Sequence, residues 1–227
     1  MDLSPIFISL KTASAAIVVT FFLGVLAAKG VAGIRHKAGK MILDGILTLP
    51  LVLPPTVAGF FLLYLFGVHG PVGRFFLEFW SVKIAFSWGA TVIAAVAISF
   101  PLMYRSARGA LEQVDPNLVY AARTLGMSEW KVFWKVSLPT ALPGVVSGGV
   151  LAFARGLGEF GATAMIAGNI PGKTRTLPLA IYSAVAAGDR EKASLYVLII
   201  VLFSFGVVAL MNYGALRKDD SPGQGRR

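Results

Sequence analysis

Long uncharged runs alternate with short charged segments along this chain. Five runs hold 17 to 29 uncharged residues each, and they cover residues 12–28, 45–73, 84–104, 136–154 and 193–216. A helix needs about 20 apolar residues to cross the hydrocarbon core of a bilayer. The pattern therefore predicts an all-α integral membrane protein with five transmembrane helices, in which residues 1–227 form a single transmembrane domain.

Two shorter uncharged runs follow the fourth predicted span. They cover residues 160–172 and 176–188, with Lys173 and Arg175 between them. Each has 13 residues, which is too short to cross a bilayer comfortably. We therefore expect segment 160–190 to be either a re-entrant element or an external surface segment, and the sequence leaves both possibilities open.

Composition agrees with a membrane protein and narrows its chemistry. Of the 227 residues, 56% are hydrophobic and 14% are charged, whereas roughly a quarter of the residues in a soluble domain are charged. The chain has no cysteine and only two histidines, His36 and His69. No cluster with metal-ligand spacing and no catalytic constellation is visible, so we expect no metal, no cofactor and no enzymatic activity of this chain.

The basic residues predict the orientation in the membrane. Lys and Arg number 21 against 11 Asp and Glu, for a net charge of +10. Thirteen of the bases fall on one side of the predicted spans and seven on the other. Loops rich in Lys and Arg stay in the cytoplasm, so the N-terminus is predicted outside and the C-terminus inside. This asymmetry accounts for most of the positive charge without any nucleic-acid partner.

The cytoplasmic segment 105–139 contains helix signals that a simple connecting loop lacks. Asp115 is a good N-cap, Pro116 fits the first helical position, and Gly126 provides a stop. Ser128 can cap a second helix over residues 129–135. Two interpretations stay open at this point: a helix lying on the bilayer surface, or a docking element for a cytoplasmic partner.

A string in this segment resembles the EAA motif of ABC importer membrane subunits. That motif reads Glu-Ala-Ala, three residues, Gly, nine residues, then Ile-x-Leu-Pro, and here it falls on Tyr120, Ala121, Ala122, Leu125, Gly126, Val136, Leu138 and Pro139. Tyr120 replaces the Glu and Val136 the Ile, so any contact of that Glu is not carried over. The resemblance implies a type I (MetI-like) permease fold and a coupling helix that inserts into a groove of a separate ATPase subunit.

Further blocks resemble the molybdate permeases among these importers, and they cover residues 49–59, 99–102, 152–155, 158–163 and 169–172. This resemblance implies a multi-pass subunit of the bacterial cytoplasmic (inner) membrane that moves molybdate by alternating access. Its implied partners are two ATPase subunits, an external (periplasmic) molybdate-binding protein, a second copy of itself and membrane lipid. Sulfate, thiosulfate or tungstate are alternative substrates. A membrane-embedded enzyme or a passive channel is the alternative class.

Several residues are candidates for the pathway or its gate. Pro54 and Pro55 deny backbone donors to the second predicted span, and broken helices at membrane depth are tolerated only inside protein or beside a water-filled cavity. We therefore expect that span to face the bundle interior, or else to carry only a packing kink. Arg155 and Glu159 lie four residues apart near the end of the fourth span, before Gly161 in a glycine-rich turn. Such charges are functional candidates, and their alternative is an anchoring ion pair.

The fourth predicted span also carries glycines suited to packing. Gly144 and Gly148 are separated by three residues. This small-xxx-small spacing lets a membrane helix approach a neighbour closely. We expect these glycines to serve helix packing and not substrate binding.

Overall fold

The computed structural model describes residues 2–34 and 36–219, and within them all regular structure is helical. The elements are α1 (Ser4–Ala32), α2 (Lys37–Val52), α3 (Pro55–Phe66), α4 (Pro71–Trp80), α5 (Trp88–Glu112), α6 (Pro116–Thr124), α7 (Glu129–Val132), the π-helix η1 (Phe133–Ser137), α8 (Leu138–Leu157), α9 (Gly161–Ala167), α10 (Leu177–Ala186) and α11 (Arg190–Asp219). The predicted all-α class is confirmed.

Three helical stretches are long and apolar enough to cross a membrane. They are α1, α5 and the continuous stretch Glu129–Leu157. The pair α2 and α3 qualifies together as a fourth span that is bent by 112°. The fifth predicted run lies in α11, where side chains are described to residue 207 and at residue 209. The described residues thus hold three candidate membrane spans, or four if the bent pair is one span and not a re-entrant loop, and the count of five stays a prediction.

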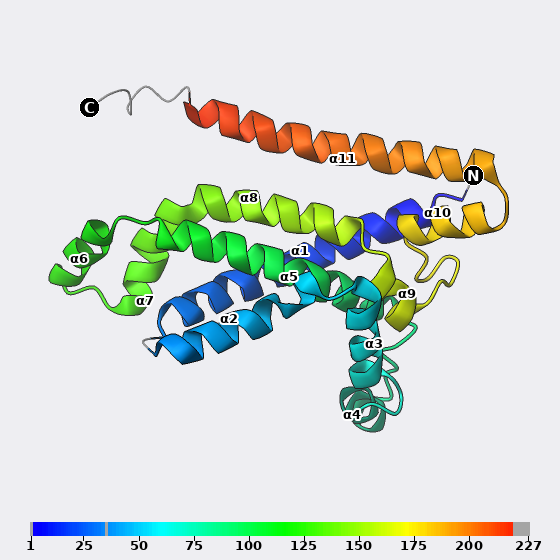
Figure 1. Ribbon diagram of the computed structural model, residues 1–227, viewed down its shortest axis with the longest axis horizontal. Coiled ribbons are helices and arrows are strands. Elements are labelled where there is room, and N and C mark those ends of the chain that lie inside the picture. Colours follow the sequence, from blue (N-terminus) through cyan, green and yellow to red (C-terminus); the bar gives the residue numbers. More distant parts are fainter. Residues whose placement is uncertain (1, 35, 220–227) are drawn as a thin grey trace.

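Helices α1, α5 and α8 form the centre of the molecule. They run lengthwise beside one another, with α6 and α7 at one end and α9 and α10 at the other (Figure 1). Their shared core includes Val25, Met103, Tyr104 and Val145, all buried. The packing is close because small residues meet. A methyl group on Gly144 would lie 2.8 Å from Ala110 Cβ, which confirms the packing role predicted for this glycine.

Buried hydroxyl groups join α1 to α5. Thr12 and Thr91 hydrogen-bond at 2.9 Å, and Thr20 and Ser99 hydrogen-bond at 3.2 Å. Each hydroxyl thereby gains a hydrogen-bond partner that lipid could not provide. They hold the two long helices in one register.

The second predicted span is broken by its prolines. Helix α2 ends at Val52, Leu53 is extended, and α3 begins at Pro55. Pro54 has no N–H, and a residue before proline avoids helical geometry, whereas Pro50 is accommodated inside α2. Helix α3 leaves the bundle with α4 at its far end (Figure 1).

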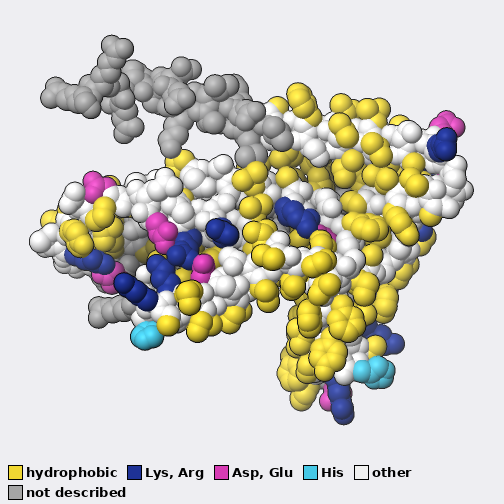
Figure 2. All heavy atoms as spheres, in the orientation of Figure 1, with side chains coloured by type: hydrophobic (Ala, Val, Ile, Leu, Met, Phe, Trp, Pro, Cys, Tyr) yellow, Lys and Arg dark blue, Asp and Glu magenta, His cyan; other side chains and the backbone are white. Residues whose placement is uncertain are grey.

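Within the single chain only part of this span packs inward: α3 buries Ala58 and Gly59. Helix α2 has no buried residue. Apolar side chains cover the visible face of the α3 and α4 region (Figure 2). The exposed large apolar residues of these two helices include Phe60, Tyr64 and Phe79. In a membrane protein such a surface suits lipid or another chain.

Candidate functional site

Helix α6 begins and ends at the residues that the sequence predicts. The Asn117 N–H donates to Asp115 Oδ1 at 2.9 Å, and Pro116 occupies the first turn. Gly126 has a φ of 75°, and the Met127 N–H donates to the Ala122 carbonyl at 3.2 Å. This closure satisfies the carbonyls at the helix end. A side chain at residue 126 would be strained, because L-residues avoid a positive φ.

The side chains of α6 divide into a free face and an attached face. Tyr120 is 60% exposed and Leu125 is 82% exposed. Ala121 is also exposed. Ala122 is 5% exposed and faces the chain itself. The free face therefore offers apolar contact area. Ala122, which the sequence predicts among the docking residues, is not part of this face, because the rest of the chain covers it.

An ion pair between Arg123 and Glu129 joins α6 to α7 and is called the clamp below. Neither residue is among the candidates predicted from the sequence. Arg123 donates to Glu129 twice, from Nε to Oε1 at 2.8 Å and from Nη2 to Oε2 at 3.1 Å. These hydrogen bonds raise the pKa of the Arg123 guanidinium above its ordinary value. Bidentate pairs of this kind fix geometry as well as charge. The clamp thus links the two short helices through side chains that are 45% and 72% exposed.

Aromatic rings of α7 and η1 contact a lysine of α1. Lys29 Nζ, near the end of α1, lies 3.6 Å from the centre of the Trp130 ring and 4.4 Å from that of Phe133. Ammonium groups are attracted to the faces of such rings. Helix α7 and the π-helix η1 are thereby tied to α1, a contact between residues about 100 positions apart.

The segment after α7 continues as one helix into the membrane. We expected the second cytoplasmic helix to end near Lys135, but α7, η1 and α8 follow one another without a break. Leu138 and Pro139 of the motif form the first turn of α8. Short π-helical segments are frequent at functional sites. The junction thus connects α7 to α8 through continuous helical structure.

Glu159 is 2% exposed and caps the next helix. The Ala162 N–H donates to Glu159 Oε1 at 2.8 Å, and a carboxylate at a helix N-terminus is stabilised by the helix dipole. Arg155 Nη1 lies 2.9 Å from Glu159 Oε2. No described donor is aligned to make a hydrogen bond to that oxygen, so we take this pair as an ion pair and not as a hydrogen bond. The arrangement favours the anchoring role for Arg155 and Glu159.

The pathway candidates meet at the break in the second span. A methyl group on Gly161 would lie 3.0 Å from Pro55 Cβ and 3.1 Å from the Thr56 nitrogen. One on Gly59 would lie 2.7 Å from Ala162 Cα. Pro54, Pro55, Gly161 and Glu159 thus share one junction between α3 and α9. Residues about 100 positions apart form it, and sequence spacing could not bring them together.

A second polar network holds α2 against α5. Tyr104 donates from its hydroxyl to Asp44 Oδ1 at 2.8 Å, and Arg108 also donates to this oxygen. Arg108 Nε donates to Glu112 Oε1 at 2.9 Å, and Lys40 lies 3.5 Å from the same carboxylate. The sequence gives no signal of this network, because its members on α2 and α5 are some 60 residues apart.

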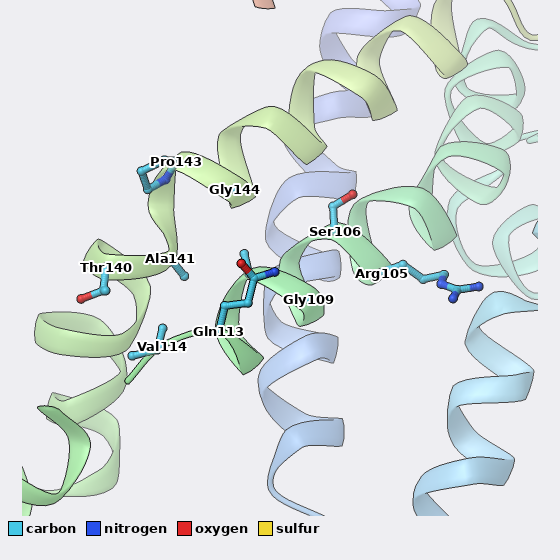
Figure 3. Close-up of a pocket in the computed structure, with 10 residues that line it drawn as sticks. Arg105, Ser106, Gly109, Gln113, Val114, Thr140, Ala141, Pro143 and Gly144 are labelled. Carbon is cyan, nitrogen blue, oxygen red and sulfur yellow. The ribbon is translucent and has the colours of Figure 1, made fainter. Parts of the chain in front are cut away.

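A cavity of about 500 Å³ opens between the C-terminal end of α5 and the N-terminal end of α8. Figure 3 shows its polar side chains, and Arg105 points away from the cavity. Thr140 donates its hydroxyl to the Val136 carbonyl at 2.7 Å. The donors do not converge on one point. Within residues 2–34 and 36–219, no three His, Asp or Glu residues are placed to hold a metal ion.

Comparison with known proteins places these features in a family. A family model described as "Binding-protein-dependent transport system inner membrane component" matches residues 20–218. The molybdenum transport system permease protein ModB of Haemophilus influenzae is 38% identical over 226 residues, which cover 99% of this chain and 98% of that protein. ModB of Escherichia coli strain K12 is 49% identical over 166 residues, 72% of each chain.

A solved structure shows the same fold. A chain in the crystal structure of a bacterial ABC transporter involved in the import of the acidic polysaccharide alginate superposes with a TM-score of 0.72. The match covers 95% of this chain and 79% of that chain at 16% sequence identity. At this identity the likeness supports the fold alone.

Proposed function

This chain belongs to the family of binding-protein-dependent transport system inner membrane components, and we propose that it is the permease subunit of an ABC importer for molybdate. The assignment of molybdate as the substrate rests on the identity of 38%, over almost the whole chain, to a protein named for molybdenum transport. Sulfate, thiosulfate and tungstate are the alternative oxyanions.

The proposal includes partners. Molybdate is a doubly charged oxyanion, and even one charge is costly at the centre of a bilayer. The anion therefore needs a protein pathway, which we place on the two-fold axis of a homodimer in the bacterial inner membrane. An external molybdate-binding protein delivers the anion, and two ATPase subunits hydrolyse ATP on the cytoplasmic side.

The coupling role is assigned to α6 and its supports. The exposed face with Tyr120, Ala121 and Leu125 docks in a groove of the ATPase, and Gly126 ends the helix. The Arg123–Glu129 clamp and the helix that continues through Leu138 and Pro139 then pass a displacement of α6 to α8. Pro54 and Pro55 supply a hinge that lets the broken span change shape during alternating access.

A substitution on the exposed face tests this coupling. Ala121→Trp places a large side chain where the ATPase would sit, so we expect the ATPase no longer to copurify while the permease still inserts. Ala38→Trp is the matched control, because Ala38 is exposed on the same predicted side of the membrane. Copurification and uptake at the normal level in Ala121→Trp would leave α6 as a bilayer-surface helix.

A second substitution tests transmission separately from docking. Gly126→Val forces a branched side chain into a left-handed conformation, at a cost of about 1–2 kcal/mol. We expect molybdate-stimulated ATP hydrolysis to fall in purified complexes. If stimulation is unchanged, the ending of α6 has no part in coupling.

Glu159→Gln distinguishes a pathway role from anchoring. Glutamine can still accept the Ala162 N–H, so the start of α9 is retained while the charge is removed. Loss of molybdate uptake in an assembled complex would support a pathway role. Normal uptake would assign Glu159 to anchoring alone.

The predicted orientation is tested with single cysteines in this cysteine-free chain. His69→Cys and Asn117→Cys are suitable because both residues are exposed. With the N-terminus outside, an impermeant thiol reagent added outside intact cells labels residue 69 and not residue 117. The reverse pattern would invalidate both the orientation and the docking role of α6.

A further inference from the structure

A small cavity at the predicted external end lies between the α3–α4 region and the loop that follows α9. Its volume is about 290 Å³, and its charged lining residues are Lys83 and Lys173. We infer that this cavity is a binding site for a tetrahedral oxyanion. The inference rests on the proposed function for its orientation and for the identity of the transported anion.

The charge of the cavity suits an anion. Lys83 and Lys173 are 90 positions apart in the sequence, and the fold brings both to one cavity. No carboxylate lines it. Among the described residues, neither lysine forms an ion pair. Two ammonium groups without a counter-charge create a local positive potential, which a doubly charged anion would neutralise.

The segment that carries Lys83 is held in place. The Phe86 N–H donates to the Ile166 carbonyl at 3.0 Å, which fixes the segment to α9. Phe86 has a φ of 58°, an uncommon conformation for a bulky residue, and such conformations cluster at ligand sites. Its ring lies so near Gly168 that a methyl group there would be 3.1 Å from it. The wall of the cavity is therefore preformed.

The same segment offers a backbone donor. Ala85 is buried and lines the cavity. Its N–H makes no hydrogen bond to the residues that the structure describes. This N–H is therefore available to an oxygen atom of a bound anion.

The loop that carries Lys173 is also rigid. The Ile170 carbonyl accepts the N–H groups of Lys173 at 3.1 Å and Thr174 at 2.9 Å. Thr174 is buried, and its hydroxyl accepts the Ile170 N–H at 3.0 Å. Asn169 donates to Ser183 at 2.6 Å and so ties the loop to α10. The backbone position of Lys173 is thus set before any ligand arrives.

The cavity lies at one end of helices α3 and α9, and the pathway candidates lie at the other end of the same helices. Phe66, the last residue of α3, lines the cavity, and Phe86 is bonded to Ile166 of α9. Helices α3 and α9 therefore run from this cavity to the junction of Pro55 with Gly161. An oxyanion held by the two lysines would lie at the external end of that helix pair.

Chemical labelling tests the site without relying on transport. In the purified permease–ATPase complex, an acetylating reagent modifies exposed lysines, and mass spectrometry gives the rate at each residue. We expect sodium molybdate to slow modification of Lys83 and Lys173 severalfold and to leave Lys192 unchanged. Lys192 is the control because it lines a different cavity on the same predicted side.

A second experiment distinguishes a free oxyanion from the phosphate headgroup of a lipid as the ligand. The labelling is repeated without molybdate, in detergent alone and with added phosphatidylglycerol. Protection by molybdate in detergent supports a site for the free oxyanion. Protection by the lipid alone supports the same site occupied by a phosphate headgroup. If neither protects both lysines, the proposed site is wrong.

Uptake by variants completes the test. Lys83→Gln and Lys173→Gln should each raise the KM for molybdate uptake into proteoliposomes with little change in kcat, whereas Lys192→Gln should not. An equal rise in all three variants would indicate general surface charge and overturn the site. Wild-type complexes that fail to transport molybdate would contradict the proposed function, while the labelling result would still decide the site.

Discussion

The central helices α1, α5 and α8 differ from the arm, which is the name used here for α2 and α3, in the contacts that hold them in place. In the centre, Met103 and Tyr104 are fully buried and small residues bring α5 and α8 into contact. Helix α2 buries no residue. It is joined to α5 by the network around Asp44 and Arg108, and α3 is joined to α9 at Gly59.

The difference indicates which part can move. Interlocked apolar packing has one favourable arrangement, because shifting it opens voids. A polar network on a partly exposed surface can break and re-form with water at small net cost. The centre therefore suits a fixed frame, and the arm, hinged at Pro54, suits the element that changes position during a transport cycle.

The largest expected effect is in the centre. A methyl group on Gly148 would overlap Ser106 Cβ, so Gly148→Ala should destabilise the permease by about 1–3 kcal/mol, as overpacking does. Gly109→Ala on α5 is the control, since a methyl group there meets nothing within 4 Å. Thermal unfolding in detergent measures both. Equal midpoints for the two variants would show that the centre accommodates the extra methyl group without cost.

A smaller effect is expected where the arm meets α9. Gly59→Ala brings a methyl group against the backbone at Ala162, and we expect a loss of about 1 kcal/mol because α3 can shift outward. Hydrogen exchange should quicken in α3 and stay unchanged in α5. Gly45→Ala on α2, where there is open space, should leave both helices unaffected. Faster exchange in α5 would mean that arm and centre are one unit.

The polar network should give a modest effect confined to α2. Asp44→Asn removes the charge that Arg108 binds, while Arg108 keeps Glu112. We expect a loss of up to about 1 kcal/mol for this partly exposed pair. Hydrogen exchange in α2 should rise. An unchanged rate would show that apolar contacts, and not this network, hold the arm.

The smallest effect is expected at the edge of that network. Lys40→Met removes one ion pair at 3.5 Å between partly exposed side chains. Such pairs contribute about 0–1 kcal/mol, so exchange in α2 should stay within error of the wild type. A rise equal to that of Asp44→Asn would make Lys40 a full member of the network.

The sequence by itself determined the features that depend on neighbours within a few residues. The uncharged runs indicated the helical membrane class, because each segment must satisfy its own backbone hydrogen bonds in lipid. Asp115 and Gly126 set the bounds of α6, because capping bonds span only one turn. Pro54 marked the break in the second span, because its ring lacks an N–H whatever surrounds it.

The tertiary structure alone decided which distant residues meet. The contact of Pro55 with Gly161, and the placement of Lys83 and Lys173 at one cavity, follow from how the helices pack. Their separation in the sequence carries no signal of either. Burial of Ala122 likewise depends on α7 and η1 folding back against α6. Local hydrogen bonding and hydropathy are properties of a segment, whereas a site between segments exists only when the packed arrangement of the whole chain is known.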